Sequence, residues 1–330
     1  MPKRPREDYY AGMLDLEGMD PTLAPCGRPA AHRERENNLL RELFRLGRLD
    51  WVNELAEGGF LAADLAEKVG RAVRIKEAIF LGLKGVTRPD VERLGPRALA
   101  LKELGLFHGQ VGVPERYPLA VELPVRRDWR RRKVAYDRPR SVLRFYRVTR
   151  SYVWELMAAN NAVETLYNYS VTIEKMARLG ISEFLDYGAG IGSLVIAAAR
   201  ADLRPRHMDL ASPTLDFARW RYKNRRLGIE MLEARGDHGD LPFSPAIVCT
   251  EVVEHVPDPL RLLDALREAV PKGGHLVISE SCRYTEKFIA HLPSNRWLGG
   301  RRFDHEMGRR GFREVFPRPR VHPRVFVRFA

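Results

Sequence analysis

Residues 184–193 read FLDYGAGIGS and place Gly188, Gly190 and Gly192 at alternate positions directly after an apolar run. Glycine leaves no side chain between the backbone and a bound group, and it adopts positive φ without strain. Where such a turn leads into a helix, the free N–H groups and the positive dipole end of that helix attract anions. The stretch therefore predicts a ligand site after the first strand of an α/β sheet.

The sequence that follows alternates between short apolar runs and longer amphipathic segments. Expected helices cover residues 192–202, 212–228 and 258–270, between expected strands at 182–189, 205–211, 228–237, 246–253 and 273–280. Strands that alternate with helices of this length are typical of βαβ units in a parallel sheet covered on both faces. In such sheets ligands bind beyond the carboxyl ends of the strands, where the strand order reverses.

The spacing of the glycines separates two classes of nucleotide ligand. The dinucleotide fingerprint is G-x-G-x-x-G, but here the third glycine comes one position early and Ser193 stands in its place. This disfavours a nicotinamide-dependent dehydrogenase. The spacing G-x-G-x-G preceded by Asp186 instead resembles the first motif of class I S-adenosylmethionine-dependent methyltransferases.

Further motifs of that family follow in order. Asp209 comes 23 residues after Asp186, within MDLASPTLDFAR, and GDHGDLPF, TEVVEHVPDP and LREAVPKGGHLVI come after it. The resemblance is to the small-molecule enzymes of ubiquinone and menaquinone biosynthesis, and it covers residues 165–285 well and 286–330 loosely. It implies a doubly wound, Rossmann-like sheet of seven strands and S-adenosylmethionine as cofactor. The chain departs from the family before the fourth expected strand, where Pro245-Ala246 replaces the usual hydrophobic-Asp pair.

The resemblance also assigns residues to the cofactor. Asp209 would accept both ribose hydroxyls, Asp237 would accept from the adenine amino group, and Asp186 would orient the turn or hold the ammonium through water. The full set of implied cofactor contacts is Asp186, Gly188, Ala189, Gly190, Gly192, Asp209, Leu210, Asp237, His238 and Glu251.

The stretch after the fourth expected strand would face the transferred methyl group. It holds Glu254 and His255, and His255 is the predicted general base because imidazole titrates near neutrality. With Glu251 these residues form an E-x-x-E-H string, which resembles a divalent-metal cluster in quinone-precursor and small-RNA 3′-end methyltransferases. The latter enzymes need a further histidine, for which His291 and His305 are available. Because relatives that bind no metal share the string, no metal ligand is assigned.

The chain divides into a loose lead-in at 1–32, a helical N-terminal domain with a basic connector at 33–150, and the methyltransferase domain at 151–330. Helices are expected over 36–46, over 60–70 with Gly70 as the stop, in IKEAIFLGLKG and GPRALALKELGLFHG, and over 152–179. Residues 111–125, with three prolines, suit an extended connector. The helical domain could cover the crevice or pair two subunits in a homodimer.

Most of the excess positive charge lies in residues 124–150. Eleven of these 27 residues are Arg or Lys and two are Asp, so this segment carries +9 of the chain's +13. It is either a solvated face or a surface for an anionic partner such as RNA. The predicted reaction is methyl transfer to an oxygen or nitrogen of a small molecule, with an RNA methyltransferase and a catalytically silent cofactor-binding protein as the alternatives.

The composition of the chain indicates in which compartment the protein is expected. No window approaches a membrane-spanning length of apolar residues, and the charged start lacks an apolar signal core. Cys26, Cys249 and Cys282 are widely spaced and are expected to be reduced thiols. We therefore expect a cytoplasmic protein without a membrane partner.

Overall fold

The structure is a computed structural model, and it describes residues 38, 41, 44, 63–112, 117–239, 241–282, 288–316 and 323–330. The lead-in 1–32, Cys26 and most of the helix expected over 36–46 lie outside these residues. Among the described helices, none is long and apolar enough to cross a bilayer. Cys249 and Cys282 are buried free thiols, as expected.

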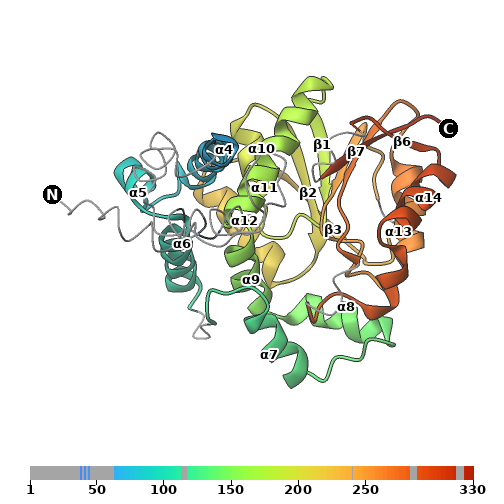
Figure 1. Ribbon diagram of the computed structural model, residues 1–330. Coiled ribbons are helices and arrows are strands. Elements are labelled where there is room, and N and C mark those ends of the chain that lie inside the picture. Colours follow the sequence, from blue (N-terminus) through green and yellow to red (C-terminus); the bar gives the residue numbers. More distant parts are fainter. Residues whose placement is uncertain are drawn as a thin grey trace, which may run out of the picture.

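A seven-stranded sheet forms the centre of the molecule (Figure 1). Its order is β3-β2-β1-β4-β5-β7-β6, with β7 antiparallel to both β5 and β6 and all the other neighbours parallel. The strands are β1 (Glu183–Tyr187), β2 (Arg204–Leu210), β3 (Glu230–Ala234), β4 (Ala246–Cys249), β5 (His275–Ile278), β6 (Phe312–Glu314) and β7 (Arg324–Arg328). This confirms the doubly wound, Rossmann-like sheet, and the order reverses between β1 and β4.

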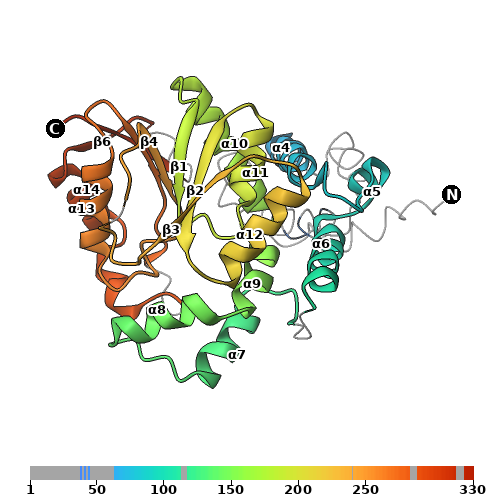
Figure 2. The ribbon, with the colours of Figure 1, turned by 180° about the vertical axis from the view of Figure 1, so that it is seen from behind.

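Helices cover both faces of the sheet, as Figures 1 and 2 show from opposite sides. The helices α10 (Val163–Arg178), α11 (Ser193–Arg200) and α12 (Pro213–Asn224) lie on one face, and α13 (Pro259–Ala269) and α14 (Arg301–Arg309) lie on the other, with the short 3-10 helix η2 (Pro293–Leu298) before α14. Local sequence starts these helices: Ser212 caps α12 by accepting from the Leu215 N–H at 3.2 Å, and proline follows the cap.

The N-terminal helices α4 (Ala63–Phe80), α5 (Arg88–Arg93) and α6 (Pro96–Val111) lie beside α10–α12. The expectation that Gly70 ends a helix is wrong, because α4 continues through it and includes the segment expected as a separate helix. Buried Ala72, Ile75 and Ile79 carry the apolar stripe onward, and this packing offsets the roughly 1 kcal/mol that an interior glycine costs.

The single helix expected over 152–179 is two helices, α9 (Ser151–Ala159) and α10. The chain breaks at Asn160 and Asn161. The side-chain amide of Asn161 donates to the Met157 carbonyl at 2.7 Å and so satisfies the end of α9.

Residues 117–122, within the expected extended connector, form neither helix nor strand, and the basic segment that follows is largely helical. Its helices α7 (Leu123–Arg131) and α8 (Pro139–Val148) lie across the carboxyl ends of the parallel strands (Figures 1 and 2). Val125, Trp129, Val142 and Phe145 are buried together with residues 290 and 292. Because these apolar faces point inward, the arginines of both helices point outward. We call α7 and α8 the cap.

A buried ion cluster joins the N-terminal helices to the sheet. Glu103 of α6 is fully buried, and its carboxylate pairs with Arg221 at 2.9 Å and Arg225 at 2.6 Å, both of α12. Arg221 also donates to the Ile191 carbonyl at 2.8 Å and to the Ser193 hydroxyl at 2.9 Å. The cluster therefore connects α6 to the glycine turn and the start of α11.

We expect Glu103→Gln to lower the free energy of unfolding by about 3 kcal/mol, because it leaves buried guanidinium charge without its counter-ion. Denaturant unfolding measures this. The matched control is Glu92→Gln in α5, whose side chain is 57% exposed and 3.8 Å from Arg88, and whose loss should cost less than about 0.5 kcal/mol. Equal effects of the two substitutions would contradict this role of the cluster.

Candidate functional site

The glycine turn between β1 and α11 forms one wall of the site. Gly188, Gly190 and Gly192 all have positive φ, at 74°, 59° and 71°. A Cβ on Gly188 would lie 2.4 Å from Val252, and one on Gly192 would lie 1.9 Å from the Tyr222 hydroxyl. The turn therefore excludes side chains both by conformation and by space.

The helix after the turn begins without a side-chain cap. Gly192 is its N-cap residue and offers no side-chain acceptor to the first N–H groups of α11. Such N–H groups, together with the dipole of the helix, favour an anionic group at this end. This uncapped helix start lies at the carboxyl end of β1, where the sequence predicted an anion site.

Two aspartates lie at the ends of neighbouring strands. Asp209 accepts from the Gly190 N–H at 2.6 Å and from the Leu210 N–H at 2.7 Å. Burial raises the pKa of Asp209 to about 6, although these two hydrogen bonds oppose the shift. Asp186 is 3% exposed, and burial together with the charge of Asp209 raises its pKa to about 8. The site thus holds one buried and one half-buried aspartate whose pKa values are both raised.

The other residues expected at the cofactor lie around the same edge. Ala189 packs near α11, and Asp237 is exposed and accepts from the Gly239 N–H at 3.2 Å. His238 is buried, with its Nδ1 2.7 Å from the Tyr187 hydroxyl. The carboxylate of Glu251 accepts hydrogen bonds of 2.7 Å each from the hydroxyls of residues 279 and 281, after β5.

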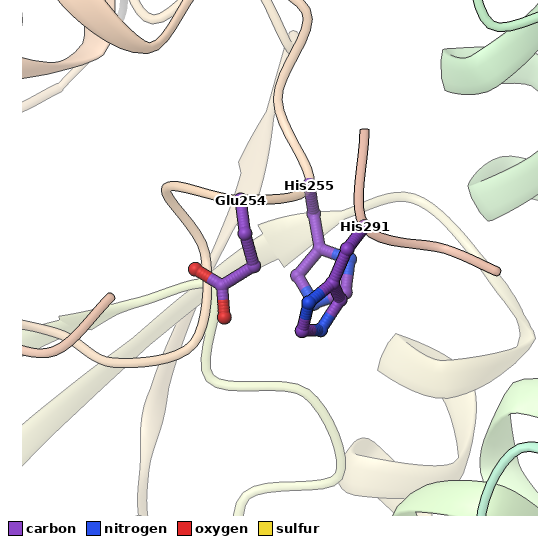
Figure 3. Close-up of side chains that lie close together, drawn as sticks. All are labelled: Glu254, His255 and His291. Atoms are coloured by element: carbon purple, nitrogen blue, oxygen red, sulfur yellow. The ribbon is translucent and has the colours of Figure 1, made fainter. Parts of the chain in front are cut away.

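Three residues from two loops form a compact cluster beyond β4. Glu254, His255 and His291 each offer one ligand atom, and these atoms lie within 4.8 Å of one another. Figure 3 shows the Glu254 carboxylate and both imidazole rings extending in the same direction from their loops. The loop backbones are fixed to each other, because the Leu292 N–H donates to the Glu254 carbonyl at 2.9 Å and Asn295 donates to two carbonyls of the 253–256 segment.

Glu254 and His291 are buried and His255 is half-buried. Both carboxylate oxygens of Glu254 and the Nδ1 of His291 lack a hydrogen-bond partner within the part of the chain that the structure describes. Burial, and then the charge of Glu251, raises the pKa of Glu254 well above its usual range. Burial, and then His291, lowers the pKa of His255 to about 3. A carboxylate beside two neutral imidazoles is a donor set that suits a divalent transition metal ion.

The sequence offered all three residues of this cluster as candidates, but not the tyrosine beside it. His291 joins it, whereas His305, the other candidate, is 61% exposed on α14 and contacts Glu306. Tyr146 was missed, although its hydroxyl lies 2.9 Å from His255 Nδ1. The signal was the spacing of Val142, Phe145 and Tyr146 behind a proline, which is typical of an amphipathic helix start and was obscured by the surrounding arginines.

Comparison with known proteins identifies the domain that carries this site. Residues 173–318 match a family model described as a methyltransferase domain. The chain contains a methyltransferase domain. The match includes the glycine turn, both aspartates and the Glu254–His255–His291 cluster.

The methyltransferase domain resembles curated enzymes over part of their length. Ubiquinone biosynthesis O-methyltransferase from Xylella fastidiosa (strain 9a5c) is 32% identical over 121 residues, which is 36% of this chain and 49% of that protein. The enzyme of that name from Alkalilimnicola ehrlichii is 28% identical over 117 residues, 34% of this chain and 47% of that protein. The chain thus spans about half the length of the curated relatives it matches.

Solved structures resemble the methyltransferase domain more distantly. An S-adenosylmethionine-dependent methyltransferase from Clostridium acetobutylicum is 16% identical, with a TM-score of 0.33, over 36% of this chain and 52% of its own. Geranyl diphosphate C-methyltransferase from Streptomyces coelicolor is 17% identical, with a TM-score of 0.37, over 49% of this chain and 62% of its own. The strand order described above, rather than these superpositions, defines the fold.

The raised pKa of Asp186 predicts a specific pH dependence of stability. Because the folded-state pKa of about 8 exceeds the usual aspartate value, the native state holds a proton that the unfolded chain has released. Stability from this group is therefore present at about pH 4 and is lost as pH rises through about pH 8.

Unfolding of the ligand-free protein across this pH range should show that Asp186→Asn gains stability relative to the original chain as pH rises. Asp216→Asn removes a carboxylate that is 68% exposed on α12 and should leave the shape of the curve unchanged. If the curve for Asp186→Asn ran parallel to that of the original chain, Asp186 would not be the buried proton carrier.

Proposed function

We propose that the protein transfers a methyl group from S-adenosylmethionine to an oxygen or nitrogen of a small-molecule acceptor. The observation that carries this proposal is the position of an uncapped helix start, the buried Asp186, the half-buried Asp209 and a Glu–His–His cluster around one edge of the sheet. The curated relatives named as O-methyltransferases support an oxygen acceptor.

The chemistry of the crevice fits S-adenosylmethionine. Its carboxylate suits the uncapped start of α11. The two ribose hydroxyls suit the Asp209 carboxylate, whose oxygens already accept from Gly190 and Leu210. Its positive sulfonium and ammonium groups would stabilise the ionised forms of Asp186 and Asp209, whose pKa values burial raises. The exposed Asp237 then accepts from the adenine amino group.

Methyl transfer is an in-line displacement, so most of its catalysis comes from holding the nucleophile against the methyl group. Val252 lies against the glycine turn at Gly188. Glu254 and His255 follow Val252 closely in the sequence, so they lie next to the proposed cofactor site. We assign the acceptor to the side of the cofactor that faces these two residues. Burial lowers the pKa of His255 to about 3, so its imidazole is neutral and is a weak proton acceptor at neutral pH. We therefore favour a role for His255 as a metal ligand over its expected role as a general base.

We therefore infer that Glu254, His255 and His291 hold a divalent cation beside the acceptor. The unpartnered buried oxygens of Glu254 and the unpartnered Nδ1 of His291 are the observations that fit it, since a cation would supply the missing partners. When bound, the cation supplies a Lewis acid that lowers the pKa of an acceptor hydroxyl. Glu251, held by its two serine hydroxyls, adds negative charge next to Glu254.

The test of the proposed function is transfer of label from methyl-labelled S-adenosylmethionine into a cell extract. We expect label to leave the cofactor and appear in small molecules. Asp209→Asn should slow transfer at limiting cofactor by about tenfold or more, because it removes a charge-assisted hydrogen-bond acceptor. Asp216→Asn should leave transfer unchanged. Cofactor binding without any release of label would support a silent binding protein instead.

The cap supports a second candidate, an RNA methyltransferase. Ten basic residues of the 124–150 segment are exposed: Arg127, Arg130, Arg131, Arg132, Lys133, Arg138, Arg140, Arg144, Arg147 and Arg150. Among the ion pairs of the described residues, none involves Arg140 or Arg144, one turn apart on α8. Exposed arginines bordering a reaction site are a surface that phosphates can bind.

Titration of single-stranded RNA over a range of salt concentrations separates the two acceptor classes. With a small-molecule acceptor we expect weak binding that varies little with salt. An RNA substrate requires log affinity to fall steeply with log salt concentration, with a slope of about −0.7 for each phosphate contacted. The double variant Arg140→Ala, Arg144→Ala should then reduce that slope by about 1.4, that is, by about 0.7 for each arginine. Such a result would overturn the small-molecule assignment.

A further inference from the structure

Tyr146 is the residue of the cap that reaches the cluster. It lies on α8, next to buried Phe145, and its hydroxyl lies 2.9 Å from His255 Nδ1 across 109 positions of sequence. The same hydroxyl donates to the Ala290 carbonyl at 3.2 Å. One phenol thus contacts both loops that carry the imidazoles of the cluster.

These contacts assign the proton on the imidazole of His255. The Ala290 carbonyl lies 3.1 Å from His255 Nδ1, and a carbonyl can only accept a hydrogen bond. Because the Tyr146 hydroxyl donates its hydrogen to the same carbonyl, the hydroxyl oxygen can only accept a hydrogen bond from His255 Nδ1–H. The proton is therefore on Nδ1, and the lone pair of His255 is on Nε2, the nitrogen available to Glu254 and His291.

Aromatic packing fixes the plane of the same imidazole. The rings of Tyr146 and Tyr152 meet the His255 ring edge-on, with centroids 6.0 Å and 6.5 Å away, and the His291 ring lies at 90° to it at 4.7 Å. Three neighbouring rings therefore hold the imidazole of His255 in one orientation.

We propose that Tyr146 is a positioning residue that holds the ring orientation of His255 and, together with the Ala290 carbonyl, its Nδ1-protonated tautomer, so that its Nε2 faces the cation proposed at Glu254 and His291. The inference rests on the proposed function for the cation. It gives the cap a role in the site through Tyr146, which is separate from any role of the exposed arginines. Outer-shell partners of metal-binding histidines contribute about 10- to 100-fold to metal affinity.

The chain offers a matched control for Tyr146→Phe. The hydroxyl of Tyr136, in the turn between the two helices of the cap, donates to the Ile289 carbonyl at 2.9 Å, one residue before Ala290. Tyr136→Phe therefore removes a hydrogen bond between the cap and the same loop without touching His255. If Tyr146 serves only to attach the cap, the two variants should behave alike.

The first measurement is titration of the ligand-free protein with Co²⁺, followed by absorbance. We expect Tyr146→Phe to bind Co²⁺ about tenfold more weakly than the original chain, and Tyr136→Phe to bind it within about twofold of the original. Equal affinity in the two variants would overturn the proposal.

The second measurement needs neither cation nor cofactor. In ¹⁵N-histidine spectra we expect His255 to be protonated at Nδ1 in the original chain and in Tyr136→Phe, and to gain an Nε2-protonated population in Tyr146→Phe. An unchanged tautomer in Tyr146→Phe would overturn the role of Tyr146. If no chain bound Co²⁺ while the tautomer changed as expected, the proposed cation would fail and the positioning of His255 would stand.

Discussion

The site depends on a close approach of backbone to ligand at the glycine turn. The positions that Cβ atoms would take at Gly188 and Gly192 are occupied by Val252 and by the Tyr222 hydroxyl. That hydroxyl is held in turn by His207 at 2.7 Å. A side chain at either position would displace the segment leading to Glu254 or a buried hydrogen bond behind the turn. The glycine turn and the segment leading to Glu254 are therefore packed closely against each other.

Parts of the chain far from the glycine turn complete the site. Glu103 of α6, through Arg221, reaches the carbonyl and hydroxyl on either side of Gly192. On the other side, the cap brings Tyr146 to His255 and covers the carboxyl ends of the strands. The helices before residue 150 are thus packed into the methyltransferase domain by buried polar contacts, which makes them part of the geometry of the site.

The sequence was sufficient for the sheet because each strand has a local signature. FLDYGAGIGS predicted β1 and its turn, and Asp209 predicted the end of β2, since spacing within βαβ units is set by local geometry. The continuation of α4 through Gly70 was not predictable, because distant packing of Ile75 and Ile79 offsets a local helix breaker. The same holds for the break at Asn161. In residues 124–150, eleven basic residues obscured a helical pattern. The contact of Tyr146 with His255 was therefore not predicted, because only the tertiary structure brings these two residues together.

The central claim is that residues 186–192 and Asp209 bind a sulfonium nucleoside. Isothermal titration calorimetry of the ligand-free chain with S-adenosylhomocysteine, the demethylated product, tests it most directly, with NAD as the comparison. The account predicts saturable heat with one site per chain for the thioether nucleoside and none for NAD. Heat with NAD and none with S-adenosylhomocysteine would contradict it.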